Sequence, residues 1–118
     1  MTRSRAVVIG GAGFIGSYVV KELNSQGYIT VIIDDLSSGK KENVPYDVEL
    51  IIADITNKDE LERTIEEGDI ILHLAALTSV PLSIENPDQY YKVNVHGTQN
   101  VFEVARIKKA KGIIFSSS

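Results

Sequence analysis

The feature that most constrains the fold is a glycine-rich segment between an apolar run and an amphipathic run. Residues 6–9 are all apolar without alternation, which is typical of a strand buried on both faces of a parallel sheet. Glycines follow at once, and from Phe14 onward apolar residues recur at helical spacing. A helix that begins there directs its free N–H groups and the positive end of its dipole toward the glycines. The segment therefore predicts an anion-binding turn.

The spacing of the glycines indicates which anion the turn binds. Gly11, Gly13 and Gly16 fit the pattern G-x-G-x-x-G, and Gly10, Gly13 and Gly16 fit the wider G-x-x-G-x-x-G. A glycine in the turn accepts a positive φ, and one that faces the ligand has no Cβ to hold a pyrophosphate away. Gly16 would let the helix pack closely against the strands. We interpret the segment as a dinucleotide site and not as a simple helix cap.

A carboxylate at the end of the next strand supports this interpretation. Residues 29–33 form a second apolar run, and Asp34 follows at about the distance from Gly16 that a ribose-binding acid occupies. Such a carboxylate accepts hydrogen bonds from ribose hydroxyls and repels a 2′-phosphate. We therefore predict NAD as the cofactor, although Lys40 and Lys41 keep NADP as an alternative.

Composition excludes several other classes of protein. The 118 residues are enough for one domain with one core. The absence of cysteine excludes disulfides and thiolate metal sites, and no metal site is predicted. A net charge of −4 argues against nucleic-acid binding. No apolar run approaches a membrane span and no signal sequence is recognisable, so we expect no membrane partner and a cytoplasmic location.

The rest of the chain alternates strands with helices. Further strands are expected at 48–53, 69–74 and 112–118, and helices at 58–67, with Thr56 as N-cap, and from Asp88 to residue 111. This order predicts an α/β fold with a doubly wound, Rossmann-like parallel sheet of about five strands. The expected strand order is 3-2-1-4-5, with right-handed crossovers.

Several polar residues fall where strands end or on a buried helix face. Asp54 and Ile55 follow the third strand and are expected beside the adenine, while capping of the next turn is an equally good role for Asp54. His73 is interpreted as a packed, hydrogen-bonded histidine and not as a catalytic one. Asn94 interrupts an apolar helix face, so it either ties a neighbouring strand or reaches the site.

Six motifs occur in order along the chain, at residues 10–16, 34–39, 53–55, 73–76, 94–98 and 115–118. Taken together, they resemble those of the extended short-chain dehydrogenase/reductase family. The likeness is strongest to its NAD-dependent sugar-nucleotide epimerases of the UDP-glucose 4-epimerase type, and it covers the whole chain. It implies NAD as cofactor and a UDP-sugar as the partner of the complete enzyme. An NAD-dependent sugar-nucleotide 4,6-dehydratase is the alternative within the group.

The resemblance also implies roles for individual residues. The pyrophosphate would meet Phe14 and Ile15, and the nicotinamide would lie along residues 74–78, braced by Asn94. Ser118 matches the serine that hydrogen-bonds the sugar hydroxyl being oxidised, so it is the predicted catalytic residue. The predicted cofactor-binding residues are Gly10, Gly13, Phe14, Ile15, Gly16, Asp34, Asp35, Leu36, Ser38, Gly39, Asp54, Ile55, Leu74, Ala75, Ala76 and Asn94.

The chain departs from the family pattern in one respect. None of its five tyrosines is followed by a lysine four residues later, whereas the family uses a Tyr-x-x-x-Lys pair as its general base. We therefore expect residues 1–118 to be an NAD-binding domain, truncated before that helix and inactive alone. A stand-alone NAD-binding or sensing module that acts through a protein partner is the alternative. The last strand would have an open edge, so a homodimer is also considered.

Overall fold

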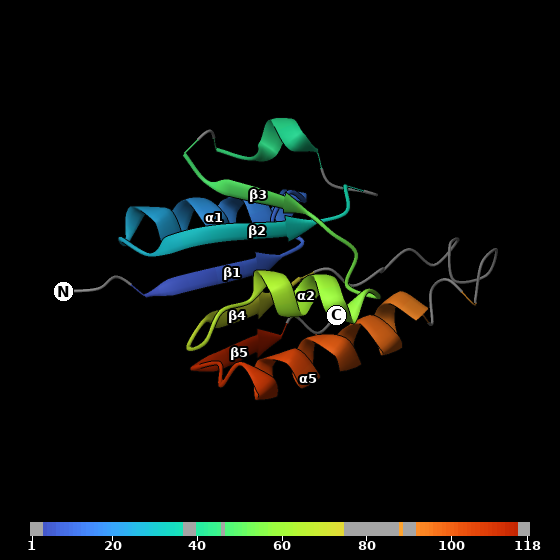
Figure 1. Ribbon diagram of the computed structural model, residues 1–118. Helices are drawn as coiled ribbons and strands as arrows, with labels where there is room; N and C mark the ends of the chain where they lie inside the picture. Colours follow the sequence, from blue (N-terminus) through green and yellow to red (C-terminus); the bar gives the residue numbers. More distant parts are fainter. Residues whose placement is uncertain (1–3, 37–39, 46, 75–87, 89–91, 116–118) are drawn as a thin grey trace.

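Five parallel strands form one sheet in the order β3-β2-β1-β4-β5 (Figure 1). The computed structural model describes residues 4–36, 40–45, 47–74, 88 and 92–115. The predicted fold class and strand order are confirmed. The strands are β1 (Arg5–Ile9), β2 (Ile29–Asp34), β3 (Glu49–Ile52), β4 (Ile70–His73) and β5 (Gly112–Phe115).

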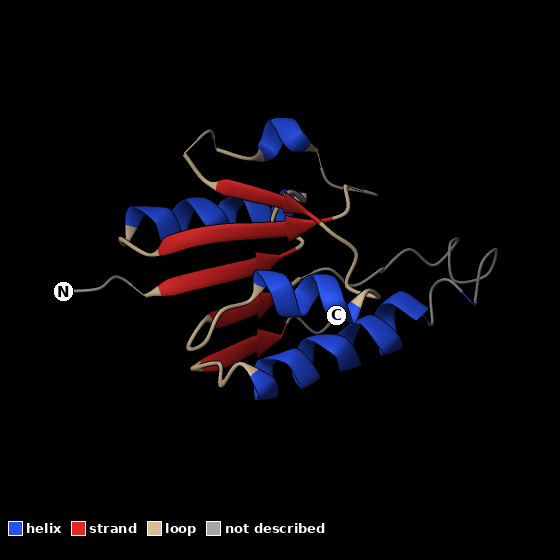
Figure 2. Ribbon diagram, in the orientation of Figure 1, coloured by secondary structure: helices blue, strands red, loops and turns tan. Residues whose placement is uncertain are grey.

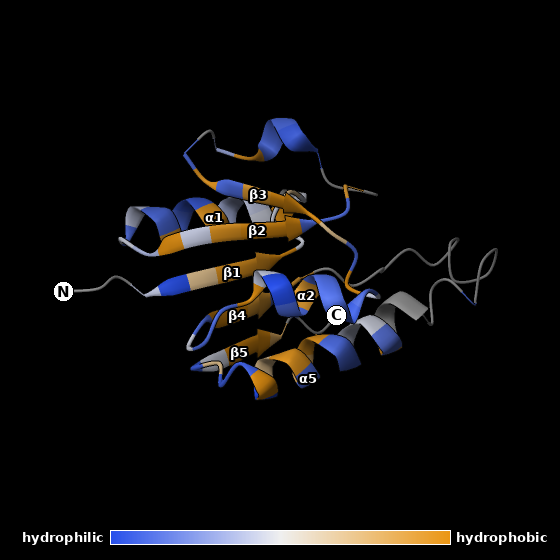
Figure 3. Ribbon diagram, in the orientation of Figure 1, coloured by the Kyte–Doolittle hydropathy of each residue, from blue (hydrophilic) through white to orange (hydrophobic). Residues whose placement is uncertain are grey.

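Helices cover the two faces of this sheet. Helix α1 (Phe14–Ser25) packs on one face, and α2 (Lys58–Thr64) and α5 (Thr98–Ile107) pack on the other (Figure 2). Side chains alternate along each strand, so Val7 and Ile9 of β1 enter the core under α2 and α5, whereas Val8 faces α1. Figure 3 shows the strands as largely hydrophobic, as expected for a sheet covered on both faces.

The register of the strands brings three chain segments together at one edge. Ile9 is paired with Ile33 of β2 on one side and with His73 of β4 on the other. The chain therefore leaves the sheet near Gly10, Asp34 and Leu74, which are neighbours at the carboxyl ends of the strands. From here the chain passes from β1 through α1 to β2 on one side, and from β4 through α5 to β5 on the other. In open α/β sheets, ligands bind where neighbouring strands connect to opposite sides in this way.

The region around α2 differs from the sequence prediction in two details. The helix ends at Thr64 and not at residue 67, because Ile65 adopts an extended backbone and its side chain is buried in the core. The prediction of Thr56 as N-cap is wrong. Asn57 is the N-cap, and its side chain accepts the N–H of Glu60 at 3.3 Å.

The predicted long helix begins differently from a regular α-helix. A π-helix, η2 (Lys92–Gly97), precedes α5. Gly97 is buried against Ile55, and a Cβ there would collide with the Ile55 side chain, so this close approach requires glycine.

Within the described part of the chain, no helix has the length and hydropathy needed to cross a bilayer.

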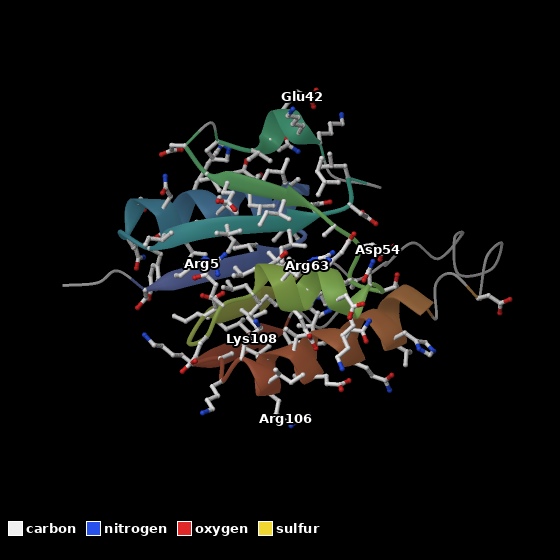
Figure 4. All side chains as sticks on the ribbon, in the orientation of Figure 1. Arg5, Glu42, Asp54, Arg63, Arg106 and Lys108 are labelled. Atoms are coloured by element: carbon white, nitrogen blue, oxygen red, sulfur yellow. The ribbon has the colours of Figure 1, made fainter. Side chains whose placement is uncertain are left out.

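An ion pair fastens the opposite, amino-terminal edge of the sheet. Arg5 lies at the start of β1, far from Asp54 at the carboxyl-terminal edge (Figure 4). Its guanidinium donates to Asp69 Oδ2 at 2.6 Å and to the Thr64 carbonyl at 3.1 Å. Asp69 also accepts the Glu66 N–H at 2.8 Å. Burial raises the pKa of Asp69, and the Glu66 N–H and Arg5 limit that rise.

Candidate dinucleotide-binding site

The turn between β1 and α1 needs glycine at its first position for conformational reasons. Gly10 has a φ of +88°, a value that residues with a Cβ rarely adopt. Its N–H donates to the Ile33 carbonyl at 2.7 Å, and its own carbonyl accepts the Gly13 N–H at 3.3 Å. Gly10 therefore turns the chain sharply at the end of β1 while keeping it attached to β2.

Two further glycines of the turn are required by packing within the chain. A Cβ on Gly11 would lie 2.8 Å from Cγ1 of Ile32. A Cβ on Gly16 would collide with the Gly10 carbonyl oxygen and would lie 2.8 Å from the Gly11 Cα. Helix α1 can thus start directly over the turn only because these positions lack side chains.

Gly13 differs from the other three glycines. Its φ of −78° and ψ of 176° are open to any residue. A Cβ built there meets only the Gly10 carbonyl oxygen, at 3.5 Å, which is an ordinary van der Waals contact. Neither backbone conformation nor packing in the described chain demands glycine at this position. A ligand that approaches the backbone closely would demand it, so the turn fits a pyrophosphate.

The start of α1 offers donors beside Gly13. The first helical hydrogen bond runs from the Ser17 N–H to the Gly13 carbonyl at 2.9 Å. The N–H groups of Phe14, Ile15 and Gly16 therefore have no acceptor among the described residues. The first turn of α1 contains no acidic residue, so the helix itself offers no carboxylate that would compete with an anion for the positive end of its dipole. Ile15 is 70% exposed. These features suit an anionic ligand.

Asp34 connects the end of β2 to the glycine turn. Asp34 is only 8% exposed. Oδ2 accepts the Ala12 N–H at 3.0 Å, and Oδ1 accepts the Leu36 N–H at 2.7 Å. A carboxylate has about four acceptor positions, so both oxygens keep capacity for ribose hydroxyls. Leu36 has a φ of 63°, and Asp35 beside it is exposed.

The loop after β2 is attached to the same turn by a residue that the sequence reasoning missed. Asn43 belongs to the 3-10 helix η1 (Lys41–Asn43), and its Nδ2 donates to the Ala12 carbonyl at 3.0 Å. The Lys40 N–H donates to the same carbonyl at 3.0 Å. No local signal identifies Asn43, because its acceptor is a main-chain atom 31 residues away.

Asp54 and Ile55 occupy the next strand end. Oδ1 of Asp54 accepts both the N–H and the hydroxyl of Thr56, each at 2.8 Å, so this carboxylate caps the following turn. That is one of the two roles predicted for it. Ile55 is buried, and its carbonyl accepts Nδ2 of Asn100 at 2.9 Å. Helix α5 therefore braces this side of the candidate site.

His73 lies at the end of β4 and is 2% exposed. Its Nε2 is 3.0 Å from Thr98 Oγ1, and its ring centroid is 5.3 Å from that of Phe115. No described residue offers a partner to Nδ1. Burial lowers the pKa of His73 to about 4, so the imidazole is neutral near pH 7. This arrangement agrees with a packed, hydrogen-bonded histidine that joins β4 to the start of α5.

The structure brings together only part of the predicted site. Gly10, Gly13, Gly16 and the main chain of Phe14 and Ile15 surround the end of β1, with Asp34 beside them. Leu74 joins them, because its N–H donates to the Ile9 carbonyl at 2.8 Å. Asp54 and Ile55 lie one strand further. The remaining predicted residues lie outside what the structure describes: Ser38, Gly39, Ala75, Ala76, Ser118 and the side chains of Phe14 and Asn94.

Comparison with known proteins agrees with this geometry. Residues 6–118 match the model of the NAD dependent epimerase/dehydratase family. The chain belongs to this NAD-dependent epimerase/dehydratase family. NAD is thus the cofactor of its family, as the glycine turn and Asp34 predicted.

Individual members of the epimerase/dehydratase family share its sequence and fold. The bifunctional UDP-glucose 4-epimerase and UDP-xylose 4-epimerase 1 of Pisum sativum is 35% identical over 97% of the chain, which spans 36% of that protein. The UDP-N-acetyl-alpha-D-glucosaminuronate decarboxylase of Bacillus cytotoxicus is 31% identical over 98% of the chain, which spans 37% of it.

A crystal structure in the family shows the same fold with its cofactor. The Thermus thermophilus UDP-glucose 4-epimerase in complex with NAD superposes with a TM-score of 0.91 at 36% identity. The superposition covers 97% of this chain and 37% of that one. The chain thus spans a little over a third of the relatives it matches.

Proposed function

We propose that the chain is the NAD-binding portion of a sugar-nucleotide epimerase of the UDP-glucose 4-epimerase type. The observation that carries its NAD-binding part is Gly13, where a Cβ would meet only an ordinary contact, next to three N–H groups of α1 that have no acceptor in the described chain. Gly10, Gly11 and Gly16 are glycines for reasons internal to the fold, whereas Gly13 is explained by close approach of a ligand. A pyrophosphate satisfies both features.

The described residues suggest how the dinucleotide is held. Gly13 would leave room for the pyrophosphate, and the N–H groups of Phe14 and Ile15 would donate hydrogen bonds to it. Asp34 accepts from the adenosine ribose through acceptor positions that Ala12 and Leu36 leave unused. NAD, when bound, supplies a hydride acceptor for the sugar carbon.

The remaining assignments follow the family pattern. Asp54 and Ile55 flank the adenine, and Asp35, Leu36, Ser38 and Gly39 border the adenosine. Leu74, Ala75 and Ala76 lie along the cofactor toward the nicotinamide, and Asn94 braces that region. Ser118 binds the sugar hydroxyl that is oxidised in the complete enzyme.

The identity of the sugar chemistry rests on the relatives and not on the described site. A decarboxylase acting on a UDP-sugar shares this part of its sequence, so the cofactor-binding portion is common to enzymes with different reactions. Most of the relatives compared are 4-epimerases, which favours epimerisation over decarboxylation or 4,6-dehydration. The proposed substrate class is a UDP-sugar.

We also propose that the chain self-associates into a homodimer. Strand β5 pairs with β4 along one edge, and no described strand covers its other edge. Ile114 of β5 is 58% exposed, and Phe102 and Ile107 of α5 are also exposed. Exposed apolar surface on an open strand favours association. The mass of the chain in solution tests this: a monomer at all concentrations refutes it.

Calorimetric titration with NAD tests the cofactor proposal. Gly13→Val should abolish NAD binding and leave the fold intact, because the added side chain starts in the space proposed for the pyrophosphate and its Cβ makes only an ordinary van der Waals contact in the free chain. The matched control is Gly112→Val, since a Cβ on Gly112 meets nothing within 4 Å and lies at the start of β5, away from the glycine turn. Unchanged NAD affinity in Gly13→Val would refute the phosphate assignment.

A further inference from the structure

Asn43 lies on an exposed turn but contacts the buried centre of the glycine turn. It ends the 3-10 helix η1, beside Glu42, which Figure 4 labels at the side of the molecule next to β3. Its Nδ2 donates to the carbonyl of Ala12 at 3.0 Å, and Ala12 is fully buried. An exposed asparagine therefore holds a main-chain group in the middle of the phosphate-binding segment.

Both main-chain polar groups of Ala12 form hydrogen bonds. Its N–H donates to Asp34 Oδ2, and its carbonyl accepts from both the Lys40 N–H and Asn43. The Ala12 carbonyl and the Gly13 N–H belong to one planar peptide group. That N–H donates to the Gly10 carbonyl at 3.3 Å, so this peptide group is fixed at both ends. Its orientation sets the direction in which the chain enters α1.

The consequence concerns the donors at the start of α1. The peptide groups that follow Gly13 carry the N–H groups of Phe14 and Ile15. Preorganised donors bind an anion better than donors that must first be oriented, because the cost of ordering is met during folding. With Asn43 removed, one of the two donors to the Ala12 carbonyl is lost, and Lys40 alone fixes it from the loop.

We propose that Asn43 is a positioning residue of the pyrophosphate site. Its hydrogen bond to the Ala12 carbonyl connects the loop after β2 to the glycine turn and so orients the N–H groups of Phe14 and Ile15. The assignment rests on the proposed function, since it requires that a dinucleotide binds here. Asn43 acts through Ala12 and need not touch the cofactor.

The test is the NAD dissociation constant of Asn43→Ala, measured by calorimetry on the 118-residue chain. We expect a rise of about five- to tenfold, the effect of one lost neutral hydrogen bond. The matched control is Asn24→Ala. Asn24 donates to Asp47 at 3.1 Å and also ties α1 to the loop before β3, but away from the glycine turn. Its removal should leave NAD affinity unchanged.

A second readout separates positioning from a general loss of stability. In the free protein, the amide NMR signals of Gly13, Phe14 and Ile15 should shift in Asn43→Ala and not in Asn24→Ala. The thermal midpoints of the two free variants should fall by similar amounts. If Asn43→Ala does not fold, Asn43→Leu replaces it in the test. Leucine keeps the side-chain volume but cannot donate a hydrogen bond, so we expect the same loss of NAD affinity.

Two outcomes would overturn the inference, and they are distinguishable. If the unaltered chain binds NAD and the Asn43 variants bind it equally well, the inference fails and the proposed function stands. If the unaltered chain does not bind NAD, the proposed function fails and the inference fails with it.

Discussion

Protonation of His73 should destabilise the folded chain in mild acid. The imidazole is buried, Nε2 contacts Thr98, and the described residues offer no acceptor for a proton on Nδ1. A charged imidazole carries a proton on both nitrogens and loses its hydration in this position. The pKa of His73 is accordingly lowered from 6.5 to about 4.

The size of the effect follows from the difference between the folded and unfolded pKa values. Because the folded value is the lower one, the unfolded chain takes up the proton first as the pH falls. The stabilisation is therefore fully present above pH 6.5 and is lost as the pH falls toward 4. The loss amounts to about 2 kcal/mol at pH 5 and about 3 kcal/mol at pH 4.

Urea unfolding at pH 7, 6 and 5 measures this loss. Carboxylates also titrate in this range, so the quantity of interest is the difference between the unaltered chain and His73→Gln. The glutamine amide can still donate to Thr98 but does not titrate. We expect the free energy of unfolding of His73→Gln to fall by about 2 kcal/mol less between pH 7 and pH 5 than that of the unaltered chain.

The chain supplies its own control. His96 is its other histidine and is exposed, so His96→Gln should keep the acid sensitivity of the unaltered chain. Parallel loss of stability in the unaltered chain and in His73→Gln would show that burial of His73 does not control the acid response, and the reasoning would be refuted.

Two further predictions concern charged residues at opposite edges of the sheet. Asp34→Asn should narrow the preference for NAD over NADP by roughly tenfold, because it removes the charge that repels a 2′-phosphate; an unchanged ratio of the two dissociation constants would exclude Asp34 from the ribose site. Arg5→Met should lower the free energy of unfolding at pH 7 by about 3 kcal/mol, since it leaves the Asp69 carboxylate buried without its partner. Urea unfolding measures this loss, and a change below about 1 kcal/mol would contradict the structural role of the pair.

Most of the fold could be predicted because its signals are local. Apolar runs such as residues 6–9 and 29–33 have the length and composition of buried parallel strands, and their alternation with helices restricts the strand order. Errors arose at element ends. Asn57 and not Thr56 caps α2, and the helix ends at Thr64, because burial of Ile65 outweighs the helical pattern of the residues that follow.

The type of ligand could be predicted from the sequence, but the reason for each glycine in the turn could not. The glycine spacing and Asp34 indicate a dinucleotide from residue type and distance along the chain. That pattern does not say which glycine serves the ligand. Gly11 and Gly16 prove to be packing requirements and Gly10 a conformational one, which leaves Gly13 as the position open to a cofactor.

The sequence by itself determined the individual strands, the place where α1 begins and the acid at the end of β2, because each depends on residues close together in the chain. Only the tertiary structure decided that Asn43 and Asp34 both form hydrogen bonds with the main chain of Ala12, and that His73 contacts Thr98. These contacts join residues 22 to 31 positions apart. No local pattern encodes such pairs, since strand pairing and helix packing bring the partners together.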